Sequence, residues 1–154
     1  MPVDLEAYVT PAKFFKWKEV LLLPSWGVYH IPSDQEYQNI ISLITKIDVL
    51  HKHFGKGINV HCCIRPSKAN CPGSKYNGMD YNSHVGGVSA SSHIPGLAID
   101  FDVTGMTVDA VMVEAAKHLN DWELSWEKNG SAVGRNWCHA QNKKVGGIWK
   151  IYNP

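Results

Sequence analysis

One short stretch of this chain holds a histidine and an aspartate at a spacing that could do metal chemistry. His93 and Asp100 both lie in Ser91–Asp102, with six residues between them. An imidazole nitrogen and a carboxylate oxygen are two of the donors that zinc takes in proteins. A histidine near an aspartate is more often a simple hydrogen bond. The pair by itself therefore only suggests two ligands of a metal site.

The local sequence explains how the two side chains could meet. Pro95-Gly96 is typical of a turn, and a turn here would fold His93 back beside Asp100. After the turn, apolar and polar residues alternate, which predicts a strand with one buried face. Asp100 would point away from the apolar face, which is formed by Leu97, Ile99 and Phe101.

A second motif near the C-terminus gives a family resemblance. Trp137 and His139 form Trp-x-His, and the earlier stretch reads Ser-x-His-x-x-Gly-x-Ala-x-Asp. In these motifs the chain resembles the M15 family of zinc peptidases, which includes D-Ala-D-Ala carboxypeptidases and phage endolysins. The likeness covers residues 13–141 and includes an arginine and a glycine pair. The matching residues are Arg65, Asn82, Gly86, Gly87, Ser91, His93, Gly96, Ala98, Asp100, Trp137 and His139.

The resemblance implies a site and a reaction. His93, Asp100 and His139 would bind one Zn²⁺, leaving a fourth position open, as catalytic zinc requires. Arg65, at a strand end, would contact a substrate carboxylate or carbonyl through its bidentate fork. The substrate would be a stem peptide of peptidoglycan, cut by a carboxypeptidase or an endopeptidase. His84 is left out because a fourth protein ligand would close the site.

The general base is the point where this chain departs from one version of the family. Some members carry a glutamate just ahead of the last ligand, where this chain has Asn136. Other members carry it on the preceding strand, and Leu124–Glu127 fits that pattern. We therefore expect Glu127 to be the base, with Glu123 as the alternative because alternation would put both on one face. Without a base, the chain would be an inactive zinc-containing module, like the hedgehog signalling domain, or a virion structural protein.

Composition limits the class of protein. The 154 residues suit one domain, with 44% hydrophobic and 19% charged residues. A net charge of +1 gives no expectation of nucleic-acid binding, and the longest apolar run, Val20–Leu23, is too short for a membrane span. The N-terminus shows no signal peptide. A cell-wall substrate would then imply a phage lysin released from the cytoplasm, a virion-borne enzyme, or a chain whose leader has been removed. We expect a monomer.

The surrounding pattern predicts an α+β domain spanning residues 1–154, with an antiparallel sheet against two main helices, as in hedgehog and D-Ala-D-Ala peptidases. Residues 1–32 would form a covering segment. Ser33 and Glu36 form a capping box for a helix reaching Phe54, and Thr107 would cap a second helix ending near Asn120. The predicted strands are Ile58–Ile64, the one after Gly96, Trp122–Glu127, one containing Trp137 and His139, and one within Val145–Tyr152, with a hairpin turn at Asn129-Gly130.

The chain has four cysteines, which are Cys62, Cys63, Cys71 and Cys138. Their spacing fits no usual zinc-finger pattern, so we expect reduced thiols. A disulfide from Cys71 to Cys62 or Cys63 is the alternative, because it would cross-link the loop predicted over Asn70–Tyr81.

Overall fold

A five-stranded sheet forms the centre of the protein, and it follows the predicted α+β class. The computed structural model describes residues 2–128 and 136–153. The strand order is β3-β4-β6-β5-β7, and every neighbouring pair is antiparallel except β5 with β7. The strands are β3 Ile58–Cys62, β4 Ala98–Val103, β5 Ser125–Glu127, β6 Cys138–Gln141 and β7 Ile151–Tyr152.

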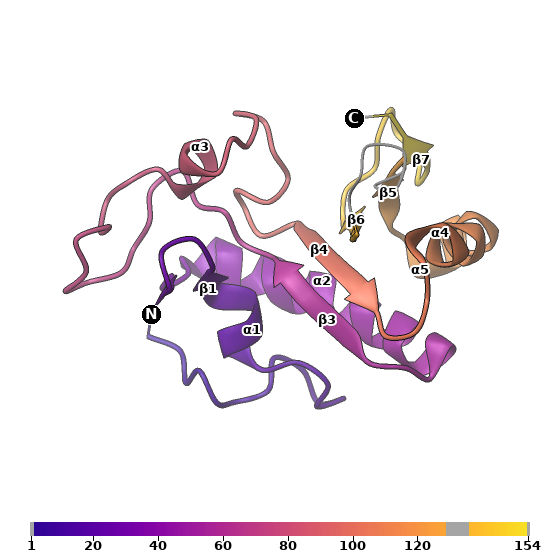
Figure 1. Ribbon diagram of the computed structural model, residues 1–154, viewed down its shortest axis with the longest axis horizontal. Helices are drawn as coiled ribbons and strands as arrows, with labels where there is room; N and C mark the ends of the chain where they lie inside the picture. Colours follow the sequence, from indigo (N-terminus) through magenta and orange to yellow (C-terminus); the bar gives the residue numbers. More distant parts are fainter. Residues whose placement is uncertain (1, 129–135, 154) are drawn as a thin grey trace.

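The longest helix, α2 (Asp34–Phe54), lies behind β3 and β4 (Figure 1). Its predicted capping box is confirmed, because the Ser33 hydroxyl accepts from the Glu36 amide and the Glu36 carboxylate accepts from the Ser33 amide. Gly55 ends it in the left-handed conformation. The helix buries one apolar stripe against the sheet, consisting of Ile40, Leu43, Ile44, Ile47 and Leu50.

The remaining helices are short. The second main helix, α4 (Val108–Lys117), begins at the Thr107 cap and buries Val111 and Ala115. Near the N-terminus, α1 (Trp17–Leu21) leads into a hairpin of β1 (Leu22–Leu23) and β2 (Val28–Tyr29). Residues near the N-terminus, among them Val9, Phe15 and Trp17, belong to the same hydrophobic core. A one-turn helix, α3 (Tyr81–His84), interrupts the loop before β4.

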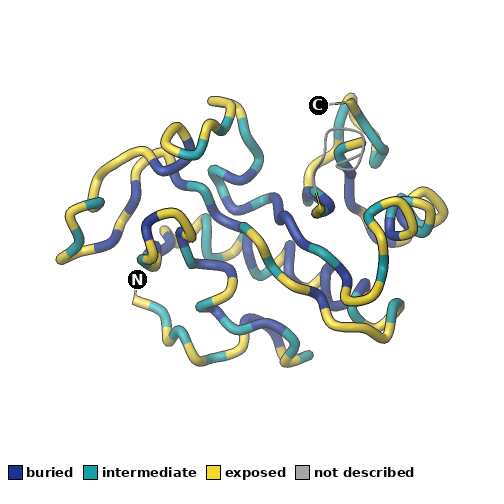
Figure 2. The backbone as a smooth tube through the Cα atoms, in the orientation of Figure 1, coloured by how far each residue is buried: buried dark blue, intermediate teal, exposed yellow. Residues whose placement is uncertain are grey.

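Strand register puts the polar side chains of four strands on one face of the sheet. Asp100 pairs directly with His139, and Glu127 pairs directly with Tyr152. Gln141, two residues after His139, pairs with Ser125, two residues before Glu127. Because alternate residues of a strand share a face, all of these side chains lie on the same side. The other side is apolar and faces the core, and β4 is buried over almost its whole length (Figure 2).

Two predictions around the C-terminal strands are wrong in part. The strand expected at Trp122–Glu127 begins only at Ser125, because the chain first forms α5 (Leu119–Trp122) and Glu123 ends it with a left-handed φ of 51°. The helix expected to end near Asn120 is therefore two helices, α4 and α5. The short strand expected within Val145–Tyr152 is present as β7, Ile151–Tyr152. The Asn129-Gly130 turn lies outside the described residues.

The cysteines agree with the expectation of free thiols. All four are unpaired, and three of them are buried. Burial raises the pKa of Cys62 and of Cys138 to about 12, so both remain protonated at neutral pH. Over residues 2–128 and 136–153, no helix has the length and apolar character needed to cross a bilayer.

Candidate metal centre and cleft

Three side chains from distant parts of the chain converge on the polar face of the sheet. The Nε2 atom of His93 lies 3.2 Å from Asp100 Oδ1, and His139 Nδ1 lies 2.9 Å from the same oxygen. The two imidazole nitrogens are 3.2 Å apart. The His93 side chain is fully buried, and the other two are about one-tenth exposed. These three residues could hold a metal ion.

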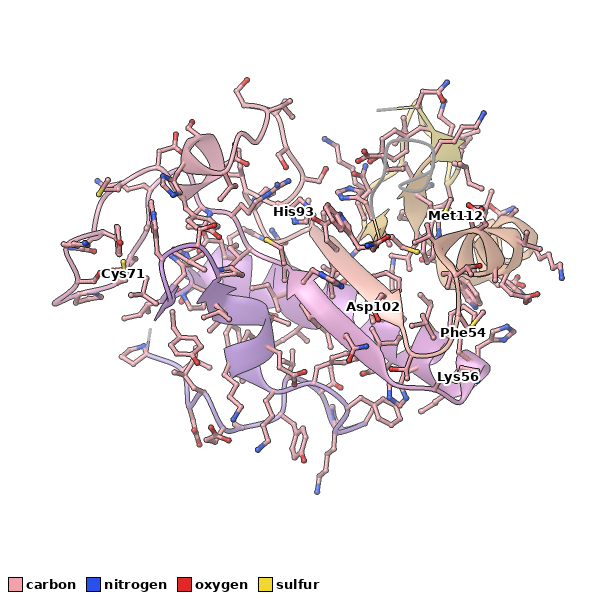
Figure 3. The ribbon with its side chains drawn as sticks, in the orientation of Figure 1. Phe54, Lys56, Cys71, His93, Asp102 and Met112 are labelled. Atoms are coloured by element: carbon pink, nitrogen blue, oxygen red, sulfur yellow. The ribbon has the colours of Figure 1, made fainter. Side chains whose placement is uncertain are left out.

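A glycine turn brings His93 to this point. Gly96 has a φ of +78°, and its amide donates to the His93 carbonyl oxygen, closing the turn ahead of β4. A Cβ atom on Gly96 would lie only 2.9 Å from Ile40 Cγ1 on α2. Only glycine therefore suits both the backbone conformation and the space. Figure 3 shows His93 at the N-terminal end of β4, with Asp102 farther along the same strand.

Hydrogen bonds on the outer side of each imidazole fix which nitrogen faces inward. His93 Nδ1 lies 2.7 Å from the Cys63 carbonyl oxygen, which only accepts, so Nδ1 carries the proton. His139 Nε2 lies 3.2 Å from Gln141 Oε1, and the Tyr152 hydroxyl donates to that oxygen at 2.8 Å. When neutral, each imidazole thus turns a lone pair toward Asp100. Two nitrogen lone pairs and a carboxylate meeting this closely fit a cation between them, and such outer hydrogen bonds are usual for metal-binding histidines.

Burial and mutual interactions shift the pKa values of Asp100, His93 and His139. Burial alone would raise the pKa of Asp100, but hydrogen bonds from His139 and His93, which form when these imidazoles are protonated, outweigh it and hold that pKa below its ordinary value. Burial lowers the pKa of His93. Burial would also lower the pKa of His139, but Asp100 outweighs this effect and the pKa is raised. The site therefore contains an ionised carboxylate, which is the form that binds a metal.

The two glutamates considered as the base occupy different places. Glu127 Oε2 lies 3.9 Å from His139 Nδ1, and the Glu127 side chain is 16% exposed in the wall of a cleft. Glu123 has a side chain that is 59% exposed, and its Oε2 lies 3.6 Å from Lys46 Nζ. The left-handed turn at Glu123 breaks the alternation that would have put both carboxylates on one face. Glu127 alone of the two adjoins the triad.

The cleft above the triad has a volume of about 730 Å³. Arg65 lines it, and its Nη2 donates to Ser91 Oγ at 3.2 Å. The buried Nε of Arg65 has no hydrogen-bond partner among the described residues. The wall includes Asp100, His139, Glu127, Trp137, Lys143, Lys144 and Tyr152. A guanidinium with an unused donor is well suited to a carboxylate or a carbonyl oxygen of a bound molecule.

The sequence matches the model of a known protein family. The model for peptidase M15 matches residues 24–141, about three-quarters of the chain. The chain belongs to the peptidase M15 family. No curated protein matches it, and no solved structure does either. Membership of the M15 family supports a metallopeptidase kind of function, and His93, Asp100 and His139 supply a possible metal site.

Some site residues could not be found from the M15 motifs. Gln141 and Tyr152 orient His139, and the carbonyl of Cys63 orients His93. Gln141 is two residues after His139, so a shared strand face was the available signal for it. No sequence signal pointed to Tyr152. His84, excluded as a ligand, has its ring 5.2 Å from that of Trp26 and is not among the residues that could hold the metal at the triad.

Proposed function

We propose that the protein is a zinc-dependent peptidase that hydrolyses peptide bonds in the stem peptides of peptidoglycan. The observation that carries the proposal is the triad of His93, Asp100 and His139 at the base of a cleft, with Glu127 beside it. A metal centre with an adjoining carboxylate in an open cleft is the arrangement that a hydrolytic metalloenzyme needs.

The donor set fits zinc. Two imidazole nitrogens and one carboxylate oxygen are a usual ligand set for catalytic zinc, and three protein ligands leave one position open. The outer hydrogen bonds to the Cys63 carbonyl and to Gln141 hold both imidazoles in the tautomers that such binding requires. Zinc, when bound, supplies a Lewis acid that makes a water molecule more acidic and polarises a carbonyl group.

Glu127 is proposed as the general base. Its Oε2 would accept a proton from the attacking water and later deliver it to the nitrogen of the leaving amine. The position of this carboxylate supports the role, because it is 3.9 Å from His139 Nδ1 and largely buried, yet it adjoins the cleft. Asn136, at the place where other members of the family carry a base, is exposed and cannot accept a proton.

Arg65 is proposed to hold the substrate. Ser91 accepts a hydrogen bond from Nη2 and so fixes the guanidinium in the cleft wall, while the buried Nε has no hydrogen-bond partner among the described residues. A substrate carboxylate would receive a bidentate contact, and the negative oxygen that develops on the scissile carbonyl would be stabilised by the same charge. Lys143 and Lys144 add positive charge to the wall. The cleft is therefore suited to a peptide that carries carboxylates.

The peptidoglycan substrate comes from the resemblance to D-Ala-D-Ala carboxypeptidases and endolysins. A lysin released from the cytoplasm or carried on a virion would meet that substrate at the cell wall, where it would act as a monomer. Peptide stems in peptidoglycan end in carboxylates, which agrees with an arginine and two lysines in the cleft.

The test is digestion of purified peptidoglycan sacculi by the zinc-loaded protein. New amino groups should appear, and the masses of the released muropeptides should identify the bond that is cut. Glu127→Gln should lower the rate by about 10²–10⁴-fold with zinc retained. Glu123→Gln is the matched control and should keep the wild-type rate, because that side chain is exposed and turned toward Lys46. Intact sacculi after prolonged incubation with zinc-loaded wild type would refute the peptidase proposal for this substrate.

A further inference from the structure

A second group of possible metal ligands lies away from the cleft, where the end of α2 meets α4. It consists of His53, Glu114 and His118. His53 Nε2 lies 3.1 Å from Glu114 Oε2, and His118 Nε2 lies 3.8 Å from the same oxygen. Phe54, next to His53, and Met112 of α4 lie on the same side of the molecule in Figure 3. Glu114 and His118 share one face of a helix turn because they are four residues apart.

The two imidazoles are arranged like those of the triad. The ring centroids of His53 and His118 are 5.0 Å apart at an interplanar angle of 66°. The corresponding values for His93 and His139 are 4.9 Å and 70°. Two imidazoles bound to one tetrahedral zinc, at about 2.1 Å each, have centroids about 5 Å apart. The second pair is therefore spaced for a shared ion, as the first pair is.

A buried tryptophan positions both rings. Trp122 is 5% exposed; the ring of His118 stacks on it at 4.7 Å, and the ring of His53 meets it edge-on at 5.2 Å. An indole fixed in the core provides a rigid support, so the imidazoles need little reordering to bind. This support distinguishes the group from an ordinary exposed ion pair, which is held only by its own charges.

Asp121 and Lys117 hold the outer atoms of His118 and Glu114 by hydrogen bonds. Asp121 Oδ2 lies 3.2 Å from His118 Nδ1, so this nitrogen carries the proton and Nε2 turns its lone pair toward Glu114. Lys117 donates to the other carboxylate oxygen of Glu114, at 2.8 Å. One carboxylate oxygen and two imidazole nitrogens remain directed at a common point.

We propose that His53, Glu114 and His118 bind a second divalent transition-metal ion, for which zinc is the probe. The three ligand atoms lie within 4.8 Å of one another. Ligands of a tetrahedral zinc lie about 3.4 Å apart, and small rotations of these three side chains, none of which is fully buried, would close the difference. The ion joins the C-terminal end of α2 to α4. It therefore stabilises the fold, and it has no part in the reaction proposed for the cleft.

The test is the zinc content of the protein after equilibrium dialysis against buffered zinc, with elemental analysis. Wild type should hold two equivalents, and His118→Ala and Glu114→Gln should each hold one. His84→Ala is the matched control, since His84 is also an exposed histidine, and it should hold two. The melting temperature of wild type should rise with free zinc after the first equivalent is bound, and this rise should be absent from both site variants.

The His139→Ala variant tests the second metal site independently of the triad. His139→Ala should lose the zinc of the triad and keep one equivalent, which Glu114→Gln in the same chain should remove. A second equivalent that survives both His118→Ala and Glu114→Gln would overturn the assignment. So would a wild-type protein that holds a single equivalent at saturating zinc and loses it in His139→Ala. Glu114→Gln preserves the size of the side chain and guards against a result caused by misfolding of His118→Ala.

Discussion

Replacing Gly96 by alanine should destabilise the protein, because this glycine makes the turn that places His93. Its φ of +78° is in the left-handed region, which costs a residue with a Cβ atom about 1–2 kcal/mol. The new Cβ would lie 2.9 Å from Ile40 Cγ1 and 3.4 Å from Ile64 Cδ1. Both isoleucines are fully buried, and overpacking of this kind costs about 1–3 kcal/mol. A middle value of about 3 kcal/mol lowers the melting temperature by about 6–12 °C in a domain of this size.

Gly105→Ala is the control for the backbone contribution. Gly105 has a φ of +74°, but no heavy atom lies within 4 Å of its Cβ position, so only the cost of about 1–2 kcal/mol applies. Urea and thermal denaturation of both variants should show the larger loss at Gly96. Zinc affinity should fall in Gly96→Ala alone, because His93 moves with the turn. Equal losses of stability in the two variants would refute the argument that close contact with Ile40 requires glycine.

Three further predictions concern single side chains. Arg65→Lys should keep zinc and fold but lose peptidase turnover, because an ammonium does not reproduce the guanidinium fork; unchanged kinetics would contradict this. Gln141→Ala should weaken zinc binding by about 10–100-fold, measured by competition with a chelator, since His139 loses its outer partner. Burial would raise the pKa of Glu36, but hydrogen bonds with His30 and Ser33 lower it below the unfolded value. Stability should therefore fall as the pH drops from about 5 through the folded-state pKa, and Glu36→Gln should flatten that slope in urea denaturation.

Local patterns were sufficient for the parts of the fold that depend on neighbouring residues. The Ser33–Glu36 capping box and the helical spacing after it predicted α2, and alternation after Gly96 predicted β4. The same local reasoning predicted that a turn folds His93 onto Asp100. These features follow from hydrogen bonds and periodicities within a few residues, which the sequence displays directly.

Features that depend on contacts between distant residues could not be predicted in the same way. Trp122 looked like the start of a strand because large apolar and polar residues alternate there, yet packing of its ring in the core favours a helix turn. The role of Tyr152 depends on β7 pairing parallel with β5, which no local pattern indicates. The separation of Glu127 from Glu123 depends on the left-handed φ of Glu123, at a residue type that rarely adopts it.

We expect peptide hydrolysis to require a metal held by His93, Asp100 and His139. The most direct measurement is the rate of amino-group release from peptidoglycan by one preparation of protein, before chelation, after chelation and after zinc is returned. We expect the rate to disappear with the metal and to recover with zinc in wild type, and not to recover in His139→Ala. A metal-free wild-type protein that still cleaves at the original rate would contradict the claim.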